Sequence, residues 1–200
     1  MNDAFSKFDV VSGKMVIHFY NIAQYSKDDY GTLGSSCMAD VPESFLYIYK
    51  ANPDVCQLVI LYDDNGSVSD GKYKSDKIIG RALLWKTTSG DMFMDRVYTA
   101  NQSDEDLFKK FAARNDWWCK QTQNSSSSFI AAKGLERKEP TYVVQLKNWD
   151  DEFPYIDTLC YLNDNSGKIS NKGAEISANY CCNDTDGTPQ EVDSDDWDDD

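Results

Sequence analysis

The stretch that most constrains how this chain can fold runs from Lys77 to Trp118. Residues 78–86 are apolar, β-branched and aromatic, which is the composition of a buried strand. Residues 87–91 contain glycine and short polar side chains and predict a turn, and residues 92–99 form a second apolar run. The two runs are therefore expected to pair as an antiparallel β-hairpin.

A helix is expected directly after this hairpin. Ser103 fits the N-cap position, and the three acidic residues that follow it place negative charge on the first turn, where the helix dipole favours it. One helical face carries apolar side chains at the required spacing: Leu107, Phe108, Phe111 and Ala112. A hairpin covered by a helix makes a sound core, but it defines no chemistry.

Further short elements are expected on both sides of this centre. Strands are predicted at 55–62, 129–132 and 142–146, two short strands within 8–20, a short helix at 42–50 and a hairpin turn at 163–167. Polar stretches at 63–76 and 121–128 predict a hairpin tip and a flexible linker. This order predicts an α+β fold with a mostly antiparallel sheet.

The charge of the chain is acidic and unevenly distributed. The formal net charge is −14, and residues 191–200 contribute seven acidic groups and no basic one. The other 190 residues then carry a net charge of −7. A segment this acidic and this poor in apolar side chains does not fold alone. We therefore expect a single domain over 1–190 and a disordered acidic tail over 191–200.

Charge and hydropathy also exclude some partners. The acidic body has no basic face dense enough to grip phosphates, so direct nucleic-acid binding is not expected. No apolar run approaches the roughly 20 residues needed to span a bilayer, so no membrane is expected either. The first residues lack the features of a secretory signal, which favours an intracellular setting.

The cysteines and carboxylates do not define a metal site. The chain has six cysteines, at Cys37, Cys56, Cys119, Cys160, Cys181 and Cys182. Their spacing is irregular and contains no C-x-x-C pair, so reduced structural thiols are favoured over disulfides and over zinc. The acidic clusters do not match an EF-hand, and no glycine-rich phosphate loop is present. We therefore expect no metal and no cofactor.

Cys37 is the one candidate nucleophile. It follows a small-residue loop, GTLGSS, and a cysteine nucleophile needs a base, for which His18 is the only histidine. His18 lies in one of the expected strands, and the alternation of that strand allows its side chain on either face of the sheet. The competing interpretation is a small-residue turn with a packed thiol.

Charged residues also lie inside the predicted strands. Asp95 and Arg96 interrupt an apolar run, and Arg81 does the same in the preceding strand. If Phe93, Asp95 and Val97 share one face, Arg96 points to the other face. Charges inside a sheet are usually satisfied structural pairs, which is the favoured interpretation here, with substrate binding as the alternative.

Two family resemblances are present. The order LVILYDD, KIIGRALLWK, FMDRVYT and DEDLFKKFAARNDW resembles the middle of the GCN5-related acyltransferases. That resemblance implies a central strand followed by a helix whose N-terminus cradles the pyrophosphate of acyl-CoA, with Val97, Thr99 and Ser103 near the cofactor. The family's cradle carries glycines, whereas residues 99–106 read TANQSDED. The resemblance therefore implies a degenerate form of the fold in which the cofactor function is lost.

The second resemblance covers more of the chain. GTLGSSCM, KIIGRALLW, MDRVYT, FPYIDTLCY and a late TDG resemble an uncharacterised family of tailed-phage proteins, over roughly residues 8–187. This resemblance implies a viral origin, with a place in the cytoplasm of an infected bacterium or in the virion. The resemblance implies no particular activity, because the family is uncharacterised.

Three functional hypotheses follow. The first is a phage accessory protein that binds another protein without catalysis, with its acidic charge favouring encounter with basic partners. The second is an acyltransferase-like enzyme with an atypical acyl-CoA site. The third is an acidic mimic of DNA that inhibits a host protein, although half of the excess charge lies in the predicted tail.

Overall fold

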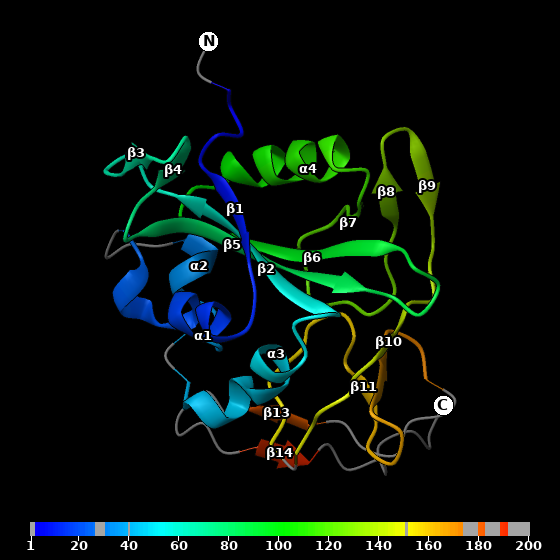
Figure 1. Ribbon diagram of the computed structural model, residues 1–200. Coiled ribbons are helices and arrows are strands. Elements are labelled where there is room, and N and C mark those ends of the chain that lie inside the picture. Colours follow the sequence, from blue (N-terminus) through cyan, green and yellow to red (C-terminus); the bar gives the residue numbers. More distant parts are fainter. Residues whose placement is uncertain are drawn as a thin grey trace.

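The computed structural model describes residues 3–26, 31–39, 41–150 and 152–173, together with the backbone of 180–182 and 189–191. Its centre is a seven-stranded sheet in the order β1-β2-β5-β6-β7-β8-β9 (Figure 1). The strands are β1 (Phe8–Val11), β2 (Cys56–Tyr62), β5 (Ile78–Lys86), β6 (Met92–Thr99), β7 (Trp118–Lys120), β8 (Ala131–Lys133) and β9 (Glu136–Lys138). All neighbours in it are antiparallel except β6 and β7, which are parallel. The predicted α+β class is confirmed.

The remaining elements lie around this sheet. The helices are α1 (Lys14–Tyr20), α2 (Gly31–Gly34), α3 (Tyr47–Ala51) and α4 (Asp104–Arg114), with short 3-10 helices at Ile22–Gln24 and Glu43–Leu46. The other strands are β3 (Ser67–Ser69), β4 (Lys72–Lys74), β10 (Val143–Gln145), β11 (Tyr161–Asn163), β12 (Lys168–Ser170), β13 (Tyr180–Cys182) and β14 (Pro189–Glu191). Strands β10, β12 and β11 form a small second sheet, and β3 and β4 form a separate hairpin.

The predicted hairpin and helix form the middle of the molecule. Strands β5 and β6 pair antiparallel, and β2 lies on the other side of β5. Helix α4 then crosses one face of the sheet and leads into β7. A Cβ added at Gly80 would lie 2.7 Å from Phe108 Cε2. The absence of a side chain at Gly80 therefore allows α4 to pack directly on β5. The apolar run and the helical periodicity were sufficient to predict this part of the fold.

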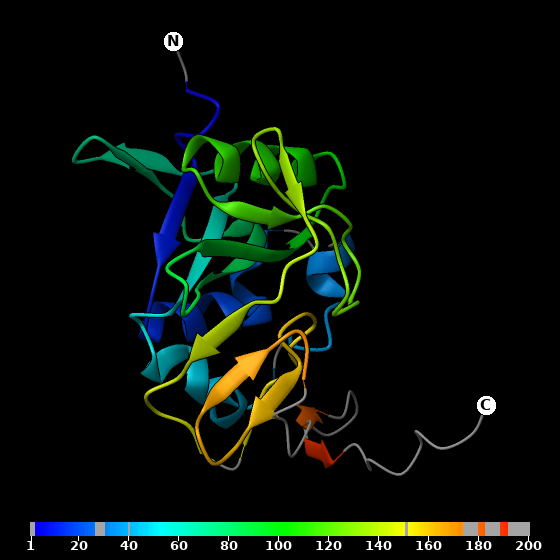
Figure 2. The ribbon, with the colours of Figure 1, turned by 90° about the vertical axis from the view of Figure 1, so that its right-hand side faces the viewer.

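Two apolar cores lie on the two faces of the sheet. The smaller one lies under α4 and contains Val59, Ala82, Val97 and Phe108. The larger one lies on the opposite face, where α1, α3 and the small sheet cover it (Figures 1 and 2). The larger core holds most of the buried aromatic side chains, and the charged side chain of Arg81 is buried on the same face, 4.0 Å from the ring of Tyr20.

Several local predictions were wrong. Residues 14–20 form helix α1 and not a strand, because Val16, Phe19 and Tyr20 recur at helical spacing and all three are buried. Residues 118–120 and 136–138 form short strands that were not predicted. The polar stretch 63–76 was expected as a hairpin tip, and it does contain a hairpin, formed by β3 and β4. Three-residue strands carry too little periodicity to be recognised.

The condition on which the facing of Arg96 depended, that Phe93, Asp95 and Val97 share one face, is not met in β6. Phe93 packs in the larger core, whereas Met94 and Val97 pack in the smaller one. The pairing of β5 with β6 shifts between Ala82 and Leu84, so that Asp95 and Arg96 together face one residue of β5. This β-bulge breaks the two-residue alternation on which the expectation was based.

Most of the predicted tail lies outside the described residues. Glu191 ends β14, while residues 192–200 and the predicted turn at 185–187 are not described. Cys56, Cys119 and Cys160 carry free thiols, as predicted for structural cysteines. Within the described ranges, no helix has the length and apolar character needed to cross a membrane.

Candidate functional site

Strand β6 separates from β7 partway along its length. The two strands pair only at Phe93 with Trp118 and at Met94 with Cys119. Beyond Met94, no strand of the described chain continues beside residues 95–99 on that side. We call this gap, bounded by residues 95–99 of β6, the β6 opening. It is the position at which the acyltransferase resemblance places its cofactor.

Side chains of the protein itself fill the β6 opening. The backbone N–H of Val97 donates to Gln123 Oε1 at 2.5 Å. The N–H of Thr99 donates to Thr32 Oγ1 at 3.0 Å, and the Thr32 hydroxyl donates back to the Thr99 carbonyl at 3.3 Å. A Cβ at Gly31 would lie 2.8 Å from the carbonyl oxygens of Thr99 and Ala100, so α2 packs closely against the end of β6. The Val97 and Thr99 donors are thus already bonded.

The start of α4 is also occupied. The Ser103 side chain makes no capping hydrogen bond, contrary to its expected role. The N–H groups of Asp104 and Glu105 donate to the backbone carbonyls of Asn101 and Gln102. Three carboxylates stand on the first turn, where they already benefit from the helix dipole. A pyrophosphate at this point would meet like charge.

Charged side chains line the buried side of the β6 opening. The Asp157 carboxylate accepts hydrogen bonds from Arg96 Nη1 at 3.3 Å and from the Tyr98 hydroxyl. The Asp157 side chain is only 8% exposed. Arg96 is therefore part of a structural ion pair, as expected, but its partner is Asp157 from a distant segment and not the adjacent Asp95.

A second charged pair lies next to the first. Asp95 Oδ1 accepts from the backbone N–H of Arg96 at 2.7 Å, and its carboxylate is also bonded by Thr158. Burial raises the pKa of Asp95, although the Thr158 hydroxyl and the positive charge of Lys120 act against that rise. Lys120 is fully buried and donates to the carbonyl of Ser126 at 2.7 Å and to Thr158 Oγ1 at 3.1 Å. Burial lowers the pKa of Lys120.

The candidate nucleophile and base do not form a hydrogen-bonded pair in the described structure. His18 is exposed on α1, and its ring contacts Phe19 edge-on at 4.8 Å between centroids. Cys37 is half-buried and packs against the larger core. Among the described residues, no hydrogen bond joins the Cys37 thiol to His18. Catalysis by this pair stays a prediction without geometric support.

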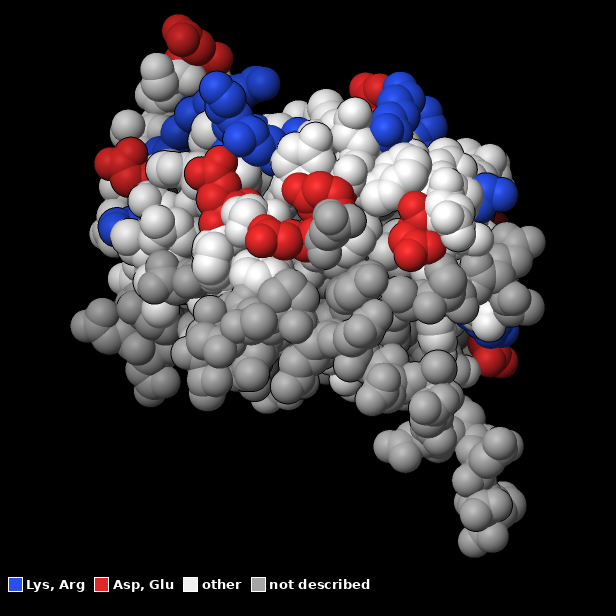
Figure 3. Space-filling view, turned by 90° about the horizontal axis from the view of Figure 1, so that it is seen from below, with Lys and Arg blue, Asp and Glu red and all other residues white. Residues whose placement is uncertain are grey.

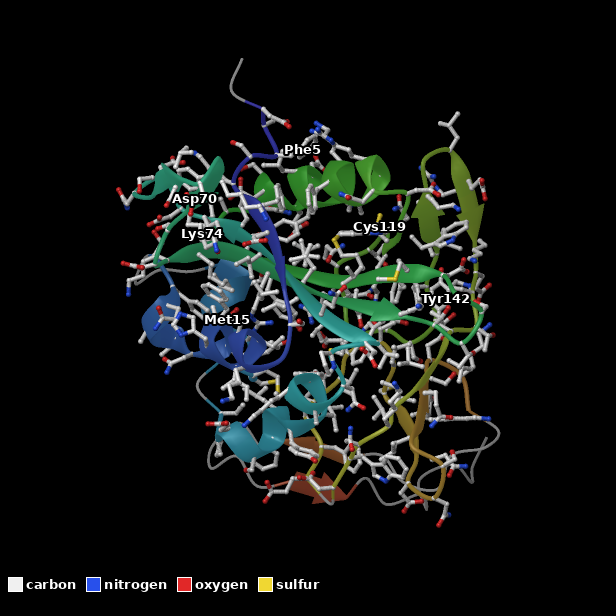
Figure 4. All side chains as sticks on the ribbon, viewed as in Figure 1. Phe5, Met15, Asp70, Lys74, Cys119 and Tyr142 are labelled. Atoms are coloured by element: carbon white, nitrogen blue, oxygen red, sulfur yellow. The ribbon has the colours of Figure 1, made fainter. Side chains whose placement is uncertain are left out.

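A groove of about 650 Å³ lies on the other side of the molecule, between β1 and the β3–β4 hairpin. Its apolar wall is formed by Phe8, Val10, Val68, Tyr73 and Phe111. The hairpin stands away from the sheet beside β1 in Figures 1 and 2, and Figure 4 labels Asp70 and Lys74 on it. Val68, near the tip, is 68% exposed. We call this feature the β1 groove.

The two walls of the β1 groove are held in place by different contacts. On one side, the Phe8 and Phe111 rings stack with centroids 4.3 Å apart and an interplanar angle of 9°. On the other side, the Tyr73 hydroxyl donates to the Asp63 carbonyl at 2.5 Å and accepts from the Gly66 N–H at 2.8 Å. These contacts fix the positions of both walls and therefore the shape of the groove.

The Asp63 carboxylate secures the base of the hairpin. It accepts hydrogen bonds from Ser26 Oγ at 3.0 Å, Asn65 Nδ2 at 2.9 Å and Ser75 Oγ at 2.5 Å. Burial acts to raise the pKa of Asp63, but these hydrogen bonds outweigh it, and the pKa is lowered from its ordinary value.

The outer edge of β1 is protected against the addition of another strand. The Tyr62 N–H donates to the Lys7 carbonyl, so alternate residues place the backbone of Phe8 and Val10 on the outer side. The N–H of Phe8 donates to the Phe5 carbonyl at 3.1 Å, and the N–H of Val10 donates to Asp9 Oδ1 at 2.9 Å. These outward donors are used within the chain, which blunts the edge. A partner would therefore bind in the groove through its side chains and not by adding a strand to β1.

The surface charge is mixed. Figure 3, which views the end of the molecule away from α4, shows acidic and basic side chains interspersed over the described part of that face. No group of three or more metal-binding side chains occurs among the described residues. Comparison with known proteins identifies no matching family model, no matching curated protein and no matching solved structure.

Proposed function

We propose that the protein acts by binding another protein through the β1 groove, without catalysis. The observation that carries this proposal is an open groove with an apolar wall, next to a sheet edge whose own donors are already bonded. The β6 opening, in contrast, is occupied by Gln123 and Thr32. A concave apolar surface of this size is a usual place for a ligand segment.

The groove favours an extended segment with apolar side chains and one carboxylate. Lys7 is paired with Asp64, whereas Lys72, which also lines the groove, has no acidic group within 4.0 Å among the described residues. A carboxylate on the partner would complement Lys72. This local requirement differs from the net charge of −14, which favours approach to basic surfaces in general.

The resemblance to tailed-phage proteins supports a particular setting for this interaction. We propose that the partner is a host or virion protein, encountered in the cytoplasm of an infected bacterium or in the virion. Infected-cell lysate is therefore the appropriate source for capture experiments.

A matched pair of variants tests the groove. Val68→Asp places a charge on the groove wall, while Leu135→Asp makes the same change on the other projecting hairpin, where Leu135 is 99% exposed. Both side chains are exposed, so both variants should melt like the unmodified protein. We expect a partner captured from lysate to be lost with Val68→Asp and retained with Leu135→Asp.

Salt distinguishes the groove from general charge attraction. Apolar contacts in the groove should keep the partner bound at high salt, because salt screens mainly exposed charges. Loss of all captured proteins at high salt, or equal capture by both variants, would reject the groove as the binding site.

Acyl-CoA binding is a second candidate, supported by one feature of the fold. Helix α4 joins the parallel strands β6 and β7, which separate beyond Met94, as the acyltransferase resemblance requires. Calorimetry with acetyl-CoA tests it directly. The protein-binding proposal expects no saturable heat, and saturable binding to the unmodified protein would instead promote the enzyme. The same titration should be repeated with Gln123→Ala, which removes the acceptor of the Val97 N–H and leaves that donor free for a cofactor.

A further inference from the structure

Arg81 is a buried cation whose charge is not balanced by a carboxylate among its described neighbours. It is 2% exposed. Its Nε donates to the Tyr25 hydroxyl at 3.3 Å, and its Nη2 donates to Ser36 Oγ at 3.1 Å. The guanidinium carbon lies 4.0 Å from the centroid of the Tyr20 ring and 4.8 Å from that of Tyr98. No carboxylate of the described chain lies within 4.0 Å of its nitrogens.

The other buried charges nearby are already paired. Arg96 contacts Asp157 at 3.3 Å, and Lys120 and Asp95 attract each other. Among the described residues, three cations and two carboxylates therefore leave one positive charge, which is that of Arg81. Burial raises the pKa values of Tyr20 and Tyr98, so these phenols stay neutral. Cation–π contacts compensate only part of the cost of burying an ion.

A small cavity adjoins this charge. Its volume is about 20 Å³, and it is lined by Arg81, Arg96, Tyr98, Ser36, Tyr155 and Asp157, among others. That volume exceeds the minimum of about 10–15 Å³ that one water molecule requires. The buried Nε of Arg96 has no hydrogen-bond partner in the described structure. Arg81 has five N–H donors, of which the hydrogen bonds to Tyr25 and Ser36 use two.

We propose that this cavity binds one monatomic anion of the halide class, which is chloride in ordinary solution. The remaining N–H groups of Arg81, the Nε–H of Arg96 and the Ser36 hydroxyl are its donors. Ser36 Oγ already accepts from Arg81 and from the Met38 N–H, so its proton is available to the anion. A water molecule fits the same space, but it leaves the Arg81 charge unbalanced.

The carboxylates that also line the cavity do not oppose this assignment. Asp157 is engaged by Arg96 and Tyr98, and Asp95 is engaged by Thr158 and the Arg96 N–H. Both carboxylates therefore already accept hydrogen bonds from protein donors other than those assigned to the anion. A volume of about 20 Å³ favours a monatomic anion over a carboxylate or a phosphate, which bring several heavy atoms each.

Crystals of the unmodified protein soaked in bromide test the proposal without any substitution. We expect an anomalous scattering peak in the cavity, in contact with the Arg81 guanidinium. Density for water alone, or for a carboxylate side chain on Arg81, would overturn the proposal.

Thermal unfolding provides the solution test. At equal ionic strength, chloride should raise Tm above its value in gluconate, which is too large for the cavity, by about 2–4 °C. Arg81→Met should abolish this difference, and Arg137→Met, which removes an exposed arginine, should keep it. If Arg81→Met fails to fold, the comparison of salts on the unmodified protein decides. A bromide peak without any difference between the salts would mean binding at crystal concentration only, and would also overturn the proposal.

Discussion

Residues 95–99 of β6 and the outer edge of β1 both lack a neighbouring strand in the large sheet, and the two places differ in how their backbone groups are satisfied. At the β6 opening, Gln123 and Thr32 accept hydrogen bonds from backbone groups that have no strand partner, and the Asp157 carboxylate bonds Arg96 nearby. At β1, the outward donors are bonded within the strand and the turn before it, but the space beside them stays open as the β1 groove.

The difference follows from access to water. Groups at the β6 opening lie in the interior, where an unbonded donor has no water to replace its partner, so distant segments have to supply acceptors. At β1, water can reach the edge, and only the addition of a foreign strand has to be prevented. Substitutions at the opening should therefore affect stability much more than substitutions in the groove.

Asp157→Asn should have the largest effect. It leaves the charge of Arg96, whose side chain is 23% exposed, without its partner, so we expect a loss near the lower end of the roughly 3–5 kcal/mol that breaking a fully buried pair costs. Urea unfolding measures the loss. Asp54→Asn is the control, because Asp54 also pairs with one cation, Lys147 at 2.7 Å, but both side chains of that pair are largely exposed. Equal effects of the two substitutions would remove the contrast between interior and surface.

Gly31→Ala should have the next largest effect. The new Cβ would lie 2.8 Å from two carbonyl oxygens of the β6 end, at a φ of +56° that disfavours a side chain. We expect a loss of about 2–3 kcal/mol from clash and backbone strain together. Gly134→Ala is a matched control, because its φ is +59° but nothing lies within 4 Å. The difference between the two losses measures how tightly α2 closes the opening.

Gln123→Leu should have an intermediate effect. It removes the acceptor of the Val97 N–H, and an unsatisfied buried donor costs about 1–3 kcal/mol. Amide hydrogen exchange provides a local measurement: the Val97 amide should lose protection, while the Val59 amide, deep in β2, should change little. Unchanged protection at Val97 would mean that water satisfies this donor, and the opening would then resemble an exposed edge.

The strands and helix around the β6 opening could be predicted from the sequence, whereas the side chains that fill the opening could not. The β5–β6 hairpin and α4 follow from apolar runs and helical spacing within about forty consecutive residues. The partners that fill the β6 opening do not, because Gln123 lies 26 residues from Val97, Thr32 lies 67 from Thr99 and Asp157 lies 61 from Arg96. No local pattern contains such contacts.

The site residues show the same limit. Asp95 and Arg96 were correctly expected to be structural, since charges inside a strand need partners, but the β-bulge that directs them is a property of the pairing with β5. The β1 groove was missed because its hairpin wall is mostly polar. The alternation around Val68 and Tyr73 was the one available signal, and it spans only three residues on each strand.

Acid should reveal the smallest effect, at the base of the groove. The pKa of Asp63 is lowered in the folded protein, so its contribution to stability is present above the unfolded pKa of about 4 and is lost as pH falls through the folded value. Unfolding free energy, measured in urea from pH 6 downward, should decrease more steeply in this range than it does in Asp63→Asn. Asp70→Asn, on the same hairpin but exposed, should retain the decrease. If Asp63→Asn retains it as well, the hydrogen bonds from Ser26, Asn65 and Ser75 do not secure the hairpin, and the wall of the groove is held by Tyr73 alone.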